Sequence, residues 1–549
     1  MRTLLGDPEQ ATLRPGYSIS FNRERMDRFT GLYGSNVGGT AAATRNNTTG
    51  FPLVPAGQSW PLLYRETNRL GPPAFAPTLV YPVTASIGAG NDLNMFDPNV
   101  ETPSTESWMV GFQRALGRDT AVEIRYVGNR NRNAWTTENW NDVNIFENGF
   151  LEEFKLAQAN LRAHVQSGCG GPGNPCSFAY RGPGTGTSPL PTYLAFFSGV
   201  NPSQAGNASL YTAGSFTNSD WTGHLSLYEP DPFDAANDLW SGTGSATRRT
   251  NATNAGLAAN FFVMNPAVDD VDITRAAAGS RYHSLQIDVR RRLSKGFTIQ
   301  GNYTFAQRWG SSLEDLHRDR IYLKTDNLPH AFKFNWLYEV PVGRGKRFGT
   351  NVNPVVDAII GGWEFSGTGR VQVRDFGVTG MRLVGMTEDE LSNEFVIRET
   401  RNAAGVTTFF NLPDDIIENT RRAFNTDPTS PTGYPAGGEP TGRYIAPASS
   451  PGCIFLFTFD CGTSEQIWVR GPWFSRWDLN FKKRFDLPGR TAFEVDFQLL
   501  NAFDNVNYNP AFNPGSGNTI FTVTSGYTDI NTTFDPGGRL GQIVTRFSW

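Results

Sequence analysis

Residues 491–503, TAFEVDFQLLNAF, alternate apolar and polar side chains with a period of two. The polar positions are Glu494, Asp496 and Gln498, and the apolar positions around them are Phe493, Val495, Phe497, Leu499 and Phe503. Successive side chains of a strand point to opposite faces, so this stretch predicts a strand with one apolar and one polar face.

The same alternation recurs along the chain and predicts about ten strands in all. The other stretches are 13–22, 106–116, 119–128, 282–293, 297–305, 332–340, 362–374, 473–485 and 539–549. Most reach nine residues or more, whereas strands of soluble proteins average about five or six. A tilted strand needs about 9–11 residues to cross a bilayer, so the lengths favour membrane-spanning strands.

The joins between these stretches alternate between tight and long. The tight joins lie near 117–119, 293–296 and 486–489, and the join at 341–361 is a medium-length member of the same class. The long joins cover about 24–102, 129–279, 308–328, 376–470 and 504–537. Short periplasmic turns and long extracellular loops are typical of outer-membrane barrels, and the count of strands places the C-terminus on the periplasmic side. The predicted fold is therefore all-β, an antiparallel transmembrane β-barrel portion, since a sheet in lipid must leave no unpaired edge.

Composition agrees with this class. Only 18% of the 549 residues are charged, against about 25% in soluble domains. A formal charge of −4 and a pI near 5.9 argue against a nucleic-acid partner. No apolar run is long enough for a transmembrane helix, and the first residues, MRTLLGDPEQ, lack the apolar segment of a signal peptide.

The four cysteines form two close pairs, Cys169 with Cys176 and Cys453 with Cys461. Neither pair has zinc-site spacing, so two loop-closing disulfides in an oxidising compartment are the simpler interpretation, with free thiols as the alternative. The five histidines are scattered and predict no metal centre. The acidic clusters 388–390 and 414–415 lack calcium-loop spacing and are interpreted as solvated loop charge. No cofactor is expected.

One long loop contains a predicted helix near 147–165, because Phe150, Phe154, Ala157 and Leu161 recur at helical spacing. Glu152 and Glu153 are adjacent and do not face each other in a helix, so a solvated face is favoured over a catalytic carboxylate pair. The stretches around 168–260 and 425–450 are rich in small and polar residues and predict flexible or turn-rich loop surface. Hydrolase, metalloprotease and P-loop motifs are missing from the sequence, so no enzyme is predicted.

Several long segments resemble one known family. They are WNDVNIFENGFLEEFKLAQANL (140–161), LQIDVRRRLSKGFTIQGNYTFAQ (285–307), LPHAFKFNWLYEVPVGRGKRFG (328–349), IIGGWEFSGTGRVQ (359–372) and NAFDNVNY (501–508). Together with the aromatic C-terminus they resemble TonB-dependent receptors with an Oar-like barrel, a type common in Acidobacteria. The resemblance runs over essentially the whole chain.

The resemblance implies that residues 1–549 are the C-terminal part of a receptor barrel. Family members carry a signal peptide, a carboxypeptidase-regulatory-like β-sandwich, a plug and a barrel of about 22 strands. Contact with the TonB complex is then expected only through a missing N-terminal plug region. The alternate C-terminal positions Ile543, Phe547 and Trp549 resemble the signal that hands such proteins to the barrel assembly machinery.

The expected function is capture of an unknown ligand by extracellular loops and its passage across the bacterial outer membrane, with membrane lipid around the barrel. A structural or adhesive outer-membrane barrel and a secreted β-sandwich that binds carbohydrate are the alternatives. The polar faces of the strands supply the candidate lumen residues, each of which could instead hydrogen-bond across the wall: Glu123, Arg125, Asp288, Arg290, Glu364, Arg370, Arg374, Asp478, Glu494 and Asp496.

Overall fold

Ten long strands pair in chain order, each antiparallel to the next, in the computed structural model. The structure describes residues 11–22, 33–34, 36, 63, 65–66, 92–312, 321–325, 327–401, 405, 407–456, 461, 466–487, 491–505, 507–510, 523–526 and 538–549. The ten strands are β1 (Ala11–Phe21), β3 (Ser104–Leu116), β4 (Thr120–Asn139), β5 (Val271–Ser294), β6 (Phe297–Ser312), β8 (Asn327–Glu339), β9 (Trp363–Val378), β15 (Phe474–Asp486), β16 (Ala492–Leu500) and β19 (Leu540–Ser548). Each coincides with a stretch of predicted alternation, so the all-β prediction and its strands are confirmed.

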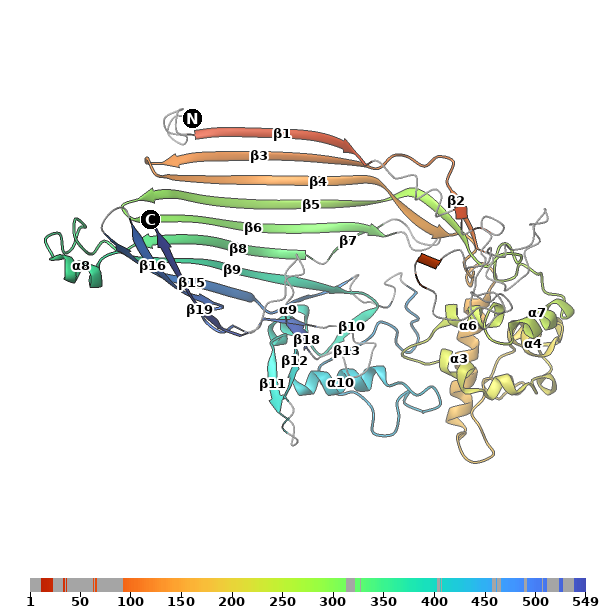
Figure 1. Cartoon of the computed structure of the whole chain (residues 1–549). Helices are drawn as coiled ribbons and strands as arrows, with labels where there is room; N and C mark the ends of the chain where they lie inside the picture. The colour runs from red at the N-terminus through yellow and green to blue at the C-terminus, as the bar shows by residue number, and fades with distance from the viewer. Residues whose placement is uncertain are drawn as a thin grey trace.

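Three short strands extend the sheet to thirteen. They are β2 (Leu93–Phe96), which runs parallel to β5, β7 (Ile321–Lys324) on β6, and β14 (Ile467–Arg470) on β9. Figure 1 shows an open, curved sheet, with both chain ends beside its tight turns. We call this end of the sheet the turn end and the opposite end the loop end.

The edges of the sheet are unpaired among the described residues. β1 pairs only with β3 and β19 only with β16, and nearly every residue of both edge strands is exposed. A closed barrel from these ten strands alone is therefore not formed.

Two folded lobes stand at the loop end (Figure 1). Lobe 1 is residues 140–270 and holds α3 (Phe150–Gln166), α4 (Pro191–Ser198), α5 (Ser219–His224), α6 (Pro232–Trp240), α7 (Ser245–Asn254) and the 3-10 turns η2 (Pro202–Gln204), η3 (Ala208–Leu210) and η4 (Gly214–Thr217). Lobe 2 is the described part of 379–466 and holds β10 (Met381–Val384), α9 (Glu388–Glu394), β11 (Arg398–Arg401), β12 (Thr407–Phe410), α10 (Asp414–Phe424) and β13 (Tyr444–Pro447). Elsewhere lie α8 (Pro354–Ile360), β17 (Tyr508–Pro510) and β18 (Val523–Gly526).

The helix predicted near 147–165 is confirmed as α3, but three other expectations for the loops were wrong. The loop predicted over 129–279 is shorter, because β4 continues to Asn139 and pairs with the start of β5. The stretch 168–260 is not simply flexible surface, since Phe178, Phe196 and Phe216 lie in a buried aromatic core. Glu153 is buried rather than solvated, whereas Glu152 is exposed and pairs with Lys155.

The predicted loops 24–102 and 504–537 lie mostly outside the described residues. No helix in the described part of the chain is both long enough and apolar enough to cross a membrane.

Candidate functional site

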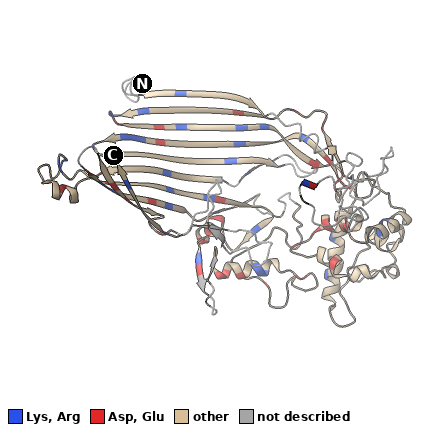
Figure 2. Cartoon of the chain, in the orientation of Figure 1, with Lys and Arg blue, Asp and Glu red and all other residues tan. Residues whose placement is uncertain are grey.

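The strand register places all ten candidate lumen residues on one face of the sheet, which we call the charged face. Glu123 lies opposite Asp288, and Arg125 lies two residues further along the same face. Glu364 lies opposite Lys482, which itself lies opposite Asp496. Figure 2 shows that both signs of charge are spread along the strands.

Glu494 is the centre of an ion network near the turn end. Its carboxylate lies 2.9 Å from Arg484 Nη1, 3.9 Å from Arg546 Nη1 and 4.0 Å from Lys482 Nζ. Lys482 also lies 3.7 Å from Glu364. Four strands are thus cross-linked by charge, and the nearly buried Glu494 is compensated by three cations.

Two further ion pairs on the charged face lie within single strands, one in β5 and one in β4. Arg290 Nε is 2.5 Å from Asp288 Oδ1, and Arg125 Nε is 3.7 Å from Glu123 Oε1. Elsewhere on this face Arg370 Nε donates to Gln372, and Asp478 pairs with Arg476 and accepts from Asn501 N. Asn480 donates to Asp496, and Arg374 lies over the ring of Phe376. The charges therefore serve mainly to hold one another along the wall.

The opposite face of the sheet is apolar and uncovered. Large apolar side chains at least one-third exposed on it are Leu13, Tyr17, Ile19, Phe21, Val110, Ile124, Tyr126, Leu285, Phe332, Tyr338, Phe497, Ile543 and Phe547. By contrast, Asp288, Glu494, Asp496 and Gln372 on the charged face are buried. Exposed apolar and buried charged side chains reverse the order of a soluble sheet, where the apolar face forms the core.

A cavity of about 480 Å³ lies between the two lobes. Lobe 1 contributes Arg162, Leu227 and Tyr228, and lobe 2 contributes the rest of the lining: Arg382, Pro431, Thr432, Tyr434, Glu439, Pro440, Tyr444 and Pro451. Its size falls within the range of about 300–1,000 Å³ that is typical of ligand sites.

Two tyrosines join the lobes at this cavity. The rings of Tyr228 and Tyr434 are stacked, with centroids 4.5 Å apart and planes inclined by 23°. Burial raises the pKa of Tyr434 well above its usual value and also raises the pKa of Tyr444, so both phenols stay protonated and can donate hydrogen bonds.

The cavity carries two cations and one carboxylate. Arg382 Nε donates to the carbonyl of Pro447 at 3.2 Å, and its other guanidinium N–H groups have no partner in the described part of the chain. Within the described residues, Arg162 has no ion-pair or hydrogen-bond partner. Glu439 is exposed at the rim. Its residues come from α3, β10, β13 and loops of two separate lobes, and no pattern in the sequence indicates that these segments meet, so the sequence does not reveal this site.

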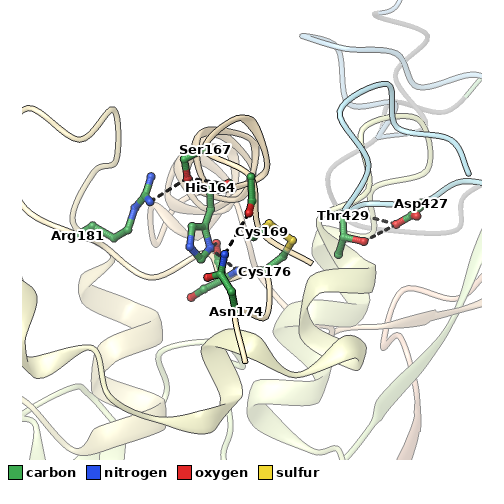
Figure 3. Close-up of a disulfide and its surroundings, with 10 residues drawn as sticks. His164, Ser167, Cys169, Asn174, Cys176, Arg181, Asp427 and Thr429 are labelled. Carbon is green, nitrogen blue, oxygen red and sulfur yellow. Dashed lines mark hydrogen bonds between the residues drawn. A yellow bond between two sulfur atoms is a disulfide. The ribbon is translucent and has the colours of Figure 1, made fainter. Parts of the chain in front are cut away.

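Both predicted disulfides are present, Cys169–Cys176 in lobe 1 and Cys453–Cys461 in lobe 2. Figure 3 shows the first beside the end of α3, where Arg181 donates to Ser167 at 3.1 Å and Asn174 donates to the Gly168 carbonyl at 3.1 Å. The C-terminal residues Ile543, Phe547 and Trp549 are exposed, and the register places Ile543 and Phe547 on the apolar face.

One histidine–carboxylate group comes together in lobe 1, although sequence analysis predicts no metal centre. His224, Asp234 and Asp238 offer ligand atoms within 4.8 Å of one another. However, Asp238 lies 3.1 Å from Nε2 of His224, whereas Asp234 lies 3.8 Å from Nδ1. The two carboxylates thus face different ring nitrogens, which is the geometry of a doubly paired imidazole rather than of one shared ion.

A family model described as "Outer membrane beta barrel domain" matches residues 6–542. No curated protein matches the chain. Among solved structures, the chain is similar to the outer membrane transporter YddB from Escherichia coli, at 8% identity and a TM-score of 0.30 over 84% of this chain and 35% of that one.

It is also similar to FpvA of P. aeruginosa bound to pyoverdines, at 7% identity and a TM-score of 0.25 over 81% of this chain and 27% of that one. The chain thus spans about a third of the length of these two proteins. Such low TM-scores carry no argument about function.

Proposed function

Because the chain belongs to the outer membrane β-barrel domain family, we propose that it acts as the C-terminal barrel portion of an outer-membrane receptor that captures a ligand and passes it across the membrane. The protein lies in the bacterial outer membrane. The observation that carries the proposal is the reversed sheet, in which apolar side chains are exposed and charged ones buried. Lipid would cover the apolar face, and the charged face would line the lumen.

The open edges support the further proposal that these strands are part of a larger barrel. An unpaired backbone group in lipid costs several kcal/mol, so β1 and β19 need partners in the membrane. Additional strands of an Oar-like TonB-dependent receptor would supply them, and a plug region outside residues 1–549 would make the contact with the TonB complex. Ile543, Phe547 and Trp549 would be read by the barrel assembly machinery.

The same proposal fixes the orientation. The turn end would face the periplasm and the lobes would face the outside, since outer-membrane barrels have short periplasmic turns and long extracellular loops. The cavity between the lobes would then be open to ligands in the medium.

We propose that the ligand of this cavity is an acidic sugar, such as a uronate oligosaccharide. The rings of Tyr228 and Tyr444, both partly exposed, suit the apolar faces of pyranose rings, while Arg162 and Arg382 suit a carboxylate, which arginine binds in bidentate fashion. Glu439 and the protonated phenols would accept or donate hydrogen bonds to hydroxyl groups.

The two alternatives fare differently. A β-sandwich requires a second layer over the apolar face, yet Phe493, Phe497, Phe334 and Trp336 are all at least partly exposed. An adhesive barrel without transport would have the same sheet and the same lobes. Only an experiment can therefore distinguish it from a receptor that transports its ligand. No catalytic residue is proposed.

The test is uptake of labelled oligogalacturonate by cells that carry the full gene, with and without dissipation of the proton-motive force. We expect energy-dependent uptake that Arg382→Gln lowers at least tenfold and that neutral glucose oligomers do not compete. Binding without uptake would support the adhesin, and unchanged uptake in Arg382→Gln would overturn the assignment of the cavity.

A further inference from the structure

One join at the turn end is far longer than its neighbours. β3 and β4 are joined through Gly117–Asp119 and β5 and β6 through Lys295 and Gly296, but β8 and β9 are separated by residues 340–362. This segment, which we call the β8–β9 segment, contains α8, and Figure 1 shows it projecting beyond the end of the sheet.

The β8–β9 segment has an ordered backbone. The side chain of Asn353 caps α8 by accepting from Val356 N at 2.9 Å. The carboxylate of Asp357 accepts from Arg344 N at 2.6 Å, which ties the turn to the helix. Gly343 has a φ of 120° and no room for a Cβ, since one would lie 2.6 Å from Asp357 Oδ1.

The surface of this ordered segment is apolar where a soluble turn would be polar. Val355 is 73% exposed, Ile359 67% and Phe348 56%. Val355 and Ile359 are four residues apart and share one side of α8, so the helix presents an uncovered apolar side. Removing such side chains from water is favourable, so an apolar environment that covers them would be stabilised by the contact.

Cations accompany this apolar side. Arg344, Lys346 and Arg347 are exposed, and Lys346 pairs with Glu339, the last residue of β8, at 3.5 Å. The segment itself contains one carboxylate, Asp357. A short amphipathic element with basic residues beside large apolar ones is the pattern of elements that lie in a membrane interface and bind anionic headgroups.

The place where α8 meets the sheet indicates whether lipid or water covers its apolar side. Trp363 Nε1 donates to the Ile359 carbonyl at 3.0 Å, and Lys483 Nζ donates to the Gly361 carbonyl. Trp363 lies opposite Lys483 in the register, and both belong to the apolar face, next to Phe365 and Phe481 on the same side. The end of α8 is therefore fastened to the side of the sheet that faces lipid, not to the charged face.

We propose that the β8–β9 segment is a membrane anchor that inserts Val355, Ile359 and Phe348 into the phospholipid leaflet at the turn end, with Arg344, Lys346 and Arg347 on the lipid phosphates. The occupant is phospholipid because the end of α8 is bonded to residues of the apolar face, the face for which lipid is proposed. Lys483 reaches along this surface and is satisfied by the carbonyl at the end of the helix. The assignment of the segment to the periplasmic leaflet rests on the proposed function. Its contact with lipid is inferred from the hydrogen bonds that Trp363 and Lys483 make with the end of α8.

The test places an environment-sensitive fluorophore on single cysteines in the full chain, reconstituted in vesicles of phosphatidylethanolamine and phosphatidylglycerol. All four native cysteines are in disulfides, so labelling is specific. We expect Val355→Cys and Ile359→Cys to give blue-shifted emission that is quenched by lipid-borne nitroxides. The matched control Asn351→Cys, exposed in the same segment, should be quenched by aqueous iodide instead.

Two further variants separate the possible outcomes. A label at Phe497→Cys reports the sheet itself: if it is in lipid while the label at Val355 is in water, the anchor is refuted and the proposed function stands. If both are in water, the barrel portion is refuted as well. The blue shift of a label at Val355 should be larger in vesicles that contain phosphatidylglycerol than in vesicles of phosphatidylcholine. The triple variant Arg344→Gln, Lys346→Gln, Arg347→Gln should abolish this difference between the two lipids. An unchanged difference would refute the role of the cations.

Discussion

The carboxylate of Glu153 accepts the backbone N–H of Thr192 at 2.8 and 2.9 Å, so that a side chain of α3 caps the first turn of α4. It also accepts from Tyr193 N at 2.9 Å. Pro191 precedes these donors and has no N–H, so Glu153 satisfies both free amides that follow it. The two helices of lobe 1 are joined by this buried contact.

Replacing Glu153 by Ala is expected to destabilise lobe 1 by about 1–3 kcal/mol, because two buried amides lose their acceptor. Glu153→Gln should cost less, since an amide oxygen remains. Glu152→Ala is the matched control and should cost little, because Glu152 is exposed. Susceptibility of lobe 1 to limited proteolysis measures the effect; equal susceptibility in Glu153→Ala and Glu152→Ala would contradict it.

Glu153 also predicts a pH dependence. Burial raises its pKa above the ordinary value, so the folded lobe binds this proton more tightly than the unfolded chain does. The stabilisation is full below the ordinary pKa of a glutamic acid and is lost as pH rises through the raised pKa. The Glu153→Gln variant should lack this component of the pH–stability profile, and an identical profile in both proteins would count against it.

His164 predicts the opposite trend beside the first disulfide. Its Nδ1 lies 2.6 Å from the amide nitrogen of Ser177, which donates to it, and 3.2 Å from the Ser177 carbonyl. Burial, with Arg181 nearby, lowers the pKa of His164. Stability from this contact is present above the ordinary pKa and is lost as pH falls through the lowered one. We expect faster proteolysis near the end of α3 at about pH 5 than at about pH 7.5, with His164→Asn insensitive to pH.

Removing the disulfide Cys169–Cys176 by double substitution with Ser should cost about 2–3 kcal/mol in lobe 1, as expected for a short closed loop. The double substitution at Cys453 and Cys461 is the matched control, since that bond closes a loop of lobe 2. Hydrogen exchange of α3 should rise only in the first variant; a rise in both, or in neither, would be inconsistent with a local role.

Gly433 of lobe 2 lies close to Tyr228 of lobe 1, which allows a test of the contact between the lobes. Its φ is +82°, and a Cβ there would lie 2.6 Å from Cε2 of Tyr228. Gly437 has a φ of +72° but open space around a Cβ, so Gly437→Ala imposes similar backbone strain without a clash. Gly433→Ala should therefore displace Tyr228 and weaken binding of oligogalacturonate by more than tenfold relative to Gly437→Ala. Equal affinities would show that the tyrosine stack does not form the site.

The strands could be predicted from the sequence wherever lipid forces one face to be apolar. Beyond residue 128, β4 continues as NRNRNAWTTEN, where both faces are polar and the alternation disappears, although pairing with β5 persists. The extension was missed because the period-two signal reports the environment of a strand rather than its hydrogen bonds.

The lobes and the cavity could not be predicted in the same way. The core of lobe 1 takes Phe178 and Phe262 from segments without helix or strand, so no periodicity marks them as buried. Tyr228 and Tyr434 meet only because the two lobes pack together. Glu153 was misassigned because its solvent exposure depends on α4, whose position the local sequence does not reveal.

The central claim is that one face of this sheet meets lipid and the other meets water. The most direct measurement is the accessibility of a nitroxide side chain placed in turn at each residue from 493 to 498, in the full chain in outer-membrane vesicles. Labels at 493, 495 and 497 should be reached by oxygen and those at 494, 496 and 498 by a water-soluble nickel chelate. Odd positions closed to both reagents, as beneath a second protein layer, would contradict the claim.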